Sequence, residues 1–156
     1  MNSKVMAIVC ALFLGGCSFD PRFHGDSSFT FQERIDIELA AQAIAKDTRT
    51  TPIEIVWDGD MSADHTIRNA KPPAEGAGGQ YVDGSVYLEP DLGPWLRVVA
   101  THEFGHVLGL RHHGGHGVMA VPAEDEWTLE DLTECRRVLL CNEGEVLFSS
   151  KALLMD

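Results

Sequence analysis

The chain has 156 residues, of which 44% are hydrophobic and 23% charged, a balance that indicates a single globular domain rather than a disordered chain. Its 24 acidic and 12 basic residues give a formal net charge of −12. This charge favours solubility and argues against nucleic acid as a partner, because binding phosphates requires a basic face.

The N-terminal residues have the features of an export signal. Lys4 supplies a positive charge ahead of Val5–Leu14, an apolar run that is too short to span a bilayer. The run ends in Leu14-Gly15-Gly16-Cys17, which resembles the lipobox of bacterial lipoproteins, in which the bond before the cysteine is cut and the cysteine is acylated. We therefore predict a signal peptide over residues 1–16 and a membrane anchor on Cys17, with a plain secretory signal as the alternative. The serine after Cys17 favours the outer membrane or the cell surface over the inner membrane.

Residues 17–28 are rich in Asp, Pro, Gly and Ser and predict a tether to a folded domain over residues 29–156. Apolar residues then recur at helical spacing from Phe31 to Ala45, which predicts an amphipathic helix. Thr30 is its expected cap, with Glu33 three residues later as the capping-box partner.

Strands are expected in the middle of the chain. Pro52–Trp57 alternates apolar and polar residues, a further short strand is expected near His65–Arg68, and Tyr81–Leu88 predicts two strands around an Asp-Gly turn. The intervening residues are rich in Asp, Gly and Pro and predict loops. Asp58–Asp64 places oxygen ligands at alternate positions, a loose calcium-like pattern, although turn chemistry explains the same residues more simply.

Two helices are expected in the second half. The first runs from about Pro94, which suits a first helical turn, to Leu110, with Gly109 as its stop signal. A loop over Arg111–Trp127 follows. Thr128 then caps a last helix that runs to about Leu140 and begins with an acidic turn.

The first of these helices carries a metal-binding pattern. His102 and His106 are four residues apart, so both imidazoles lie on one helix face and can bind the same Zn²⁺. Gly109 lets the chain turn sharply, so that His112 can return as a third ligand. Three protein ligands leave one position for water, as a catalytic zinc requires, and Glu103 beside the first ligand can act as the general base on that water.

This motif resembles the metzincin signature H-E-x-x-H-x-x-G-x-x-H, which it matches at every fixed position. The resemblance implies a Met-turn beneath the zinc, and Met119, seven residues after His112, is the expected methionine. Val99–Leu110 is most similar to the matrixins, the matrix-metalloproteinase group. His113 departs from the serine that matrixins usually have, and Ala120-Val121-Pro122 departs from their usual Tyr-Pro.

The resemblance implies an α/β (α+β) fold. We expect a small twisted mixed β-sheet with a long N-terminal helix, a helix carrying the zinc motif, a Met-turn and a C-terminal helix. It also implies a monomeric endopeptidase with one catalytic zinc that hydrolyses peptide bonds. A peptide substrate would lie antiparallel to an edge strand between His65 and Tyr81, and Val121–Glu124 would form part of the S1′ pocket wall.

Two other functions remain open at this point. The domain could be a catalytically idle zinc- or peptide-binding surface lipoprotein, or a zinc amidase acting on a non-protein substrate. His113 and His116 could line the rim of the cleft, although solvated positions are favoured. The resemblance also allows a second, structural zinc, but its usual run of ligands is not apparent, and Asp64-His65 is a weak candidate pair.

The four cysteines are expected to differ in their roles. Cys10 leaves with the signal peptide and Cys17 takes lipid. Cys135 and Cys141 could form a short disulfide in an oxidising compartment, provided that the last helix ends before Cys141.

Overall fold

The computed structural model describes residues 22–48, 53–57, 65–121, 123–124, 128, 130–131 and 133–135. The predictions for the signal peptide, Cys17, the calcium-like run Asp58–Asp64 and Cys141 lie outside these residues. Within the described ranges, no helix is long and apolar enough to cross a bilayer.

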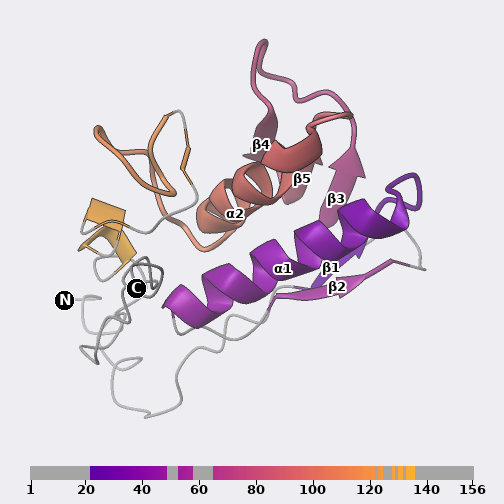
Figure 1. The fold of residues 1–156 in the computed structure, drawn as a ribbon, viewed down its shortest axis with the longest axis horizontal. Helices are drawn as coiled ribbons and strands as arrows, with labels where there is room; N and C mark the ends of the chain where they lie inside the picture. Colours follow the sequence, from indigo (N-terminus) through magenta and orange to yellow (C-terminus); the bar gives the residue numbers. More distant parts are fainter. Residues whose placement is uncertain are drawn as a thin grey trace, which may run out of the picture.

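A five-stranded mixed sheet forms one layer of the domain (Figure 1). Its strands lie in the order β2-β1-β3-β5-β4, and only β4 runs antiparallel to its neighbour. This confirms the small mixed sheet expected from the resemblance. The strands are β1 (Arg22–Gly25), β2 (Glu54–Val56), β3 (Thr66–Asn69), β4 (Gly79–Val82) and β5 (Ser85–Leu88).

Strand β1 corrects the part of the predicted tether, residues 17–28, that the structure describes from Arg22 onward. Arg22–Gly25 pairs in parallel with β2 on one side and β3 on the other. Phe23 is fully buried, while a Cβ at Gly25 would collide with the Trp57 ring. The segment has only one large apolar side chain, so its strand is fixed by pairing with distant residues and not by a local pattern.

Strands β4 and β5 form the predicted hairpin. Its two turn residues, Asp83 and Gly84, both have positive φ, of 48° and 77°, as a tight two-residue hairpin turn requires. β4 is an edge strand of the sheet. The edge strand is expected between His65 and Tyr81; β4 begins near the end of that interval and extends one residue beyond it.

Helix α1 (Phe31–Thr48) confirms the first predicted helix and continues three residues beyond its expected end. Its capping box forms as predicted: the Thr30 amide donates to Glu33 Oε2 (2.7 Å), and the Glu33 amide donates to Thr30 Oγ1 (3.3 Å). The second predicted helix begins with a 3₁₀ turn, η1 (Gly93–Trp95), and continues as α2 (Leu96–Val107).

Helices α1 and α2 pack against each other and against one face of the sheet (Figure 1). The Phe23 ring of β1 meets the Phe104 ring of α2 at 6.1 Å between centroids. This core holds α2 rigidly beside β4, and so fixes the polar face of α2 next to the sheet edge. Its fully buried large side chains include Phe23, Ile37, Ile44, Ile67, Val86, Leu88 and Phe104.

Candidate metal centre

The end of helix α2 brings the third histidine back to the first two. Gly109 has φ 86°, its amide donates to His106 O (2.9 Å), and the Leu110 amide donates to Gly105 O (2.9 Å). This is the pair of hydrogen bonds that defines a Schellman ending. The chain turns back there, as the sequence predicted for Gly109, and presents His112 to the helix.

The three predicted ligands converge on one point. His112 Nε2 lies 2.9 Å from the Nε2 atoms of both His102 and His106, and those two atoms lie 3.2 Å from each other. Nitrogens bound to one tetrahedral zinc would lie about 3.3 Å apart, so this triangle is close to the size that a single ion needs. Within the described part of the chain, the candidate ligand cluster contains these three residues and no fourth.

Backbone carbonyls fix the tautomers of the first two ligands. His102 Nδ1 lies 2.6 Å from Val118 O, and His106 Nδ1 lies 2.9 Å from Leu110 O. A carbonyl can only accept, so each Nδ1 must carry the proton and each Nε2 must present a lone pair. Lone pairs facing one another repel unless a cation lies among them, so this arrangement fits a metal ion.

The protonation of these rings also suits a metal. Burial lowers the pKa of His102 from 6.5 to about 4; the Val118 hydrogen bond opposes this, and the neighbouring His106 and His112 lower it further. Burial likewise lowers the pKa of His106. Both shifts favour the neutral imidazole, the form in which histidine binds metals.

Glu103 lies buried on the same helix, 4% exposed. Burial raises its pKa from 4.5 to about 7, and a hydrogen bond from the Tyr81 backbone of β4 partly opposes this shift. Its Oε2 has no hydrogen-bond partner among the described residues. A buried carboxylate with a free oxygen and a pKa near neutrality has the properties of a general base.

A cleft of about 920 Å³ runs beside this centre between β4 and α2. His102, Glu103, His106 and His112 line it, together with mostly apolar side chains. Of the predicted S1′ segment Val121–Glu124, Val121 and Ala123 line the cleft, and Pro122 lies outside the described residues. Glu124 does not line the cleft and instead pairs with His116 at 2.8 Å.

Met119, the residue predicted for a Met-turn, lies fully buried beneath the ligand-bearing helix. A Cβ at Gly105 would collide with Met119 Sδ, so glycine between the two ligands makes room for the sulfur. Gly79 has a similar role at the sheet edge, where a Cβ would lie 2.9 Å from the Glu103 carboxylate. Neither glycine could be assigned a role from the sequence, because each role depends on a side chain from another element.

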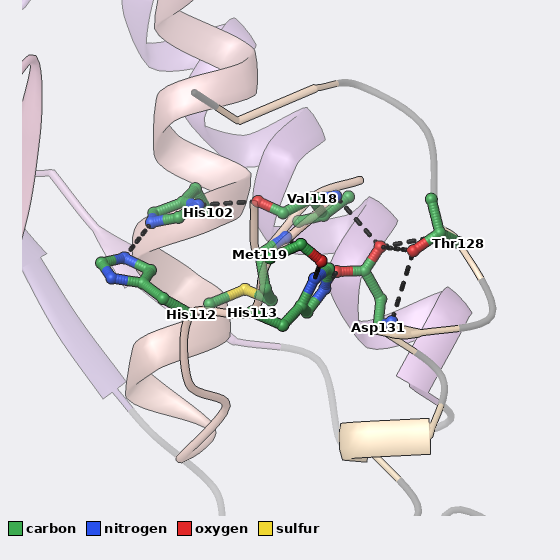
Figure 2. A network of polar contacts seen from close by, with 8 residues as sticks. His102, His112, His113, Val118, Met119, Thr128 and Asp131 are labelled. Carbon is green, nitrogen blue, oxygen red and sulfur yellow. Dashed lines mark hydrogen bonds and ion pairs between the residues drawn. The ribbon is translucent and has the colours of Figure 1, made fainter. Parts of the chain in front are cut away.

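A fully buried carboxylate supports the Met-turn (Figure 2). Asp131 accepts hydrogen bonds from the backbone amides of Val118 (3.0 Å), Met119 (2.8 Å) and Thr128 (2.8 Å). The Thr128 hydroxyl also donates to it (3.0 Å) and accepts from its amide (3.4 Å), so Thr128 caps the helical turn that begins here, as predicted. The sequence identified Asp131 only as part of an acidic first turn.

His113 corrects the expectation of a solvated side chain. Its Nε2 lies 2.8 Å from Asp131 Oδ1, and the side chain is only 17% exposed. Burial opposes protonation, but the hydrogen bonds to Asp131 and Gly114 and the neighbouring acidic charges raise the pKa of His113 overall. His116 is solvated, with its side chain 83% exposed, and its hydrogen bond to Glu124 raises its pKa.

The other candidates give a mixed result. His65, a conceivable structural-zinc ligand, packs against the Phe23 ring (5.2 Å between centroids). Cys135 is buried and disulfide-bonded, but its partner lies outside the described residues, so the pairing with Cys141 stays a prediction.

The matrixin family model, Peptidase M10, matches residues 10–131, which include the whole centre. The chain belongs to the matrixin family. A search of curated proteins found no significant match. Matrixins are zinc metallopeptidases, so family membership and the three converging imidazoles both indicate a metal-dependent peptidase.

Proposed function

We propose that this matrixin is a zinc-dependent endopeptidase with His102, His106 and His112 as its metal ligands. The convergence of three Nε2 lone pairs beside a buried carboxylate carries the proposal. A zinc ion held there would polarise the scissile carbonyl and acidify a water molecule, which is the chemistry that peptide hydrolysis needs.

Glu103 would carry the protons. Its Oε2, which has no partner in the described part of the chain, would accept a proton from the attacking water and later return it to the leaving amine. The Tyr81 amide and the close approach of Gly79 hold the carboxylate against the sheet edge. Burial raises the pKa of this carboxylate, which favours its uptake of a proton from water.

Strand β4 would bind the substrate. It is an edge strand, and Gly79, Gln80 and Tyr81 line the cleft beside the metal ligands. An extended peptide lying antiparallel to it would gain main-chain hydrogen bonds, and side-chain pockets would set the preference. Protein or peptide substrates therefore fit this cleft.

The decisive experiment compares Glu103→Gln with the parent on a peptide library, with zinc content measured in both. We expect the variant to keep its zinc and to lose at least about 10²-fold in kcat, the usual contribution of a general base. Glu33→Gln, in the first turn of α1 and not in the lining of the cleft, is the matched control and should leave kcat unchanged.

Other outcomes would point elsewhere. Equal cleavage by Glu103→Gln and the parent would rule out the proposed mechanism. A parent that holds zinc but cleaves no peptide would support the idle binding protein, or an amidase if a non-protein amide is hydrolysed instead.

We further propose that Cys17 is acylated and anchors an exported domain to the outer membrane or cell surface. The support is the lipobox-like Leu14-Gly15-Gly16-Cys17 alone. Incorporation of labelled palmitate into the parent but not into Cys17→Ser would bear this out, and equal labelling would refute it.

A further inference from the structure

His113 makes one hydrogen bond to the Met-turn and one to the carboxylate that supports it. Its amide donates to Met119 O (3.2 Å), and its Nε2 bonds to Asp131 Oδ1 (2.8 Å). The same Oδ1 accepts the Met119 amide. His113 is therefore hydrogen-bonded both to the backbone of the Met-turn and to the carboxylate that supports it (Figure 2).

These contacts link the ligands on the two sides of the metal centre. On one side, His113 is covalently joined to the ligand His112. On the other side, Asp131 holds the Val118 amide (3.0 Å), and the Val118 carbonyl accepts from Nδ1 of the ligand His102 (2.6 Å). A continuous path of bonds thus runs from His112 through Asp131 to His102.

We propose that His113 is a positioning residue for the metal centre, which sets the separation of His112 and His102 through its hydrogen bond to Asp131. Partners of this kind, one step removed from the metal, commonly change metal affinity 10- to 100-fold when they are lost. The inference rests on the proposed zinc site but not on peptidase activity.

The rigidity of Asp131 makes this role physically reasonable. The carboxylate is fully buried and accepts five hydrogen bonds, three from backbone amides and two from side chains. Moving it would leave buried donors without a partner, which is costly. A side chain bonded to such a group is held in one place, and so is the neighbouring backbone of His112.

A second histidine–carboxylate pair in the same loop provides a matched control. His116 Nδ1 lies 2.8 Å from Glu124, the same distance as in the His113–Asp131 pair. The side chains of His116 and Glu124 are 83% and 45% exposed. Those of His113 and Asp131 are 17% and 0% exposed. Exposed pairs of this kind contribute little, so removal of His116 should not disturb the metal.

The experiment compares His113→Ala, His113→Gln and His116→Ala in the full chain. The rate of zinc loss to a chelator, the visible spectrum of the Co²⁺-substituted protein and the melting temperature of the metal-free protein are measured for each. We expect His113→Ala to lose zinc about 10- to 100-fold faster and to show shifted Co²⁺ bands. Glutamine places an amide nitrogen near the position of Nε2, so His113→Gln should restore most of both properties, and His116→Ala should match the parent.

The Co²⁺ bands separate positioning from a general loss of stability, because a merely structural role would lower the melting temperature and leave the bands unchanged. Parental zinc retention and unchanged bands in His113→Ala would overturn the inference while leaving the proposed function intact. A parent that binds no zinc would instead overturn the proposed function itself.

Discussion

Two capping boxes in this molecule have the same local geometry and different surroundings. In each, a threonine amide donates to an acid three residues later, at 2.7 Å for Thr30–Glu33 and 2.8 Å for Thr128–Asp131. In each, the acid's own amide donates back to the threonine hydroxyl, at 3.3 and 3.4 Å. The sequence motif is therefore equally informative about the start of a helix in both places.

The difference lies in what else the acid contacts. Glu33 is partly exposed and lies at the start of α1, whereas Asp131 is fully buried and also holds Val118, Met119 and His113. Gly117, at φ 126°, has no Cβ that would collide with the Asp131 carboxylate. One box starts a helix, while the other also fixes the loop that completes the metal centre.

The largest expected effect comes from removing the Asp131 carboxylate, with Glu33 as the comparison. Asp131→Ala leaves several buried donors unsatisfied and should lower the free energy of unfolding by about 3–5 kcal/mol. Glu33→Ala removes a partly exposed capping contact and should cost about 0.5–1 kcal/mol. Urea unfolding of both variants without metal measures the difference, and equal losses would show that burial does not distinguish the two boxes.

Glu103 sharpens the comparison, because it is a buried acid whose Oε2 is unpaired among the described residues. Its folded-state pKa of about 7 exceeds the ordinary 4.5, so the folded protein holds an extra proton between these pH values. The stability that this proton contributes is present below pH 4.5 and is lost as the pH rises through 7. His102, with its pKa lowered to about 4, has the opposite effect: its contribution is present above pH 6.5 and is lost as the pH falls towards 4.

Glu103→Gln removes the pH-dependent contribution of Glu103 and keeps that of His102. In the metal-free protein, its free energy of unfolding should therefore rise relative to the parent by roughly 3 kcal/mol between pH 4.5 and pH 7. Urea unfolding at pH 4.5, 5.5, 6.5 and 7.5 checks this. A difference that does not vary with pH would mean that folding does not raise the pKa of Glu103. Zinc should reduce the difference, because a nearby cation favours the carboxylate charge.

The same contrast, between local contacts and contacts across elements, separates the features that the sequence predicts from those that it does not. Spacing on one helix places His102, Glu103 and His106, and the Gly109 stop signal returns His112, so these residues could be identified without a structure. The α1 capping box and the Asp-Gly hairpin are also local and were predicted correctly.

The residues that the sequence did not identify act across elements. Asp131 meets the Met-turn from a different part of the chain, the partly buried His113 bonds to Asp131, and β1 is a strand because β2 and β3 flank it. Short polar segments carry no periodicity that would reveal such contacts. The ligands can therefore be predicted from local spacing, whereas their supports depend on tertiary packing.

Smaller effects than those at Asp131 and Glu103 are expected at the two threonines. Thr30→Ala and Thr128→Ala should each cost about 1 kcal/mol of unfolding free energy, since each removes one capping hydroxyl. Only Thr128→Ala should also increase the rate of zinc loss, and by less than His113→Ala, because its hydroxyl bonds Asp131 Oδ2 and not the oxygen that His113 contacts. Chelator competition on both variants tests this. Equal zinc retention at equal cost in stability would mean that the second box, like the first, does no more than start a helix.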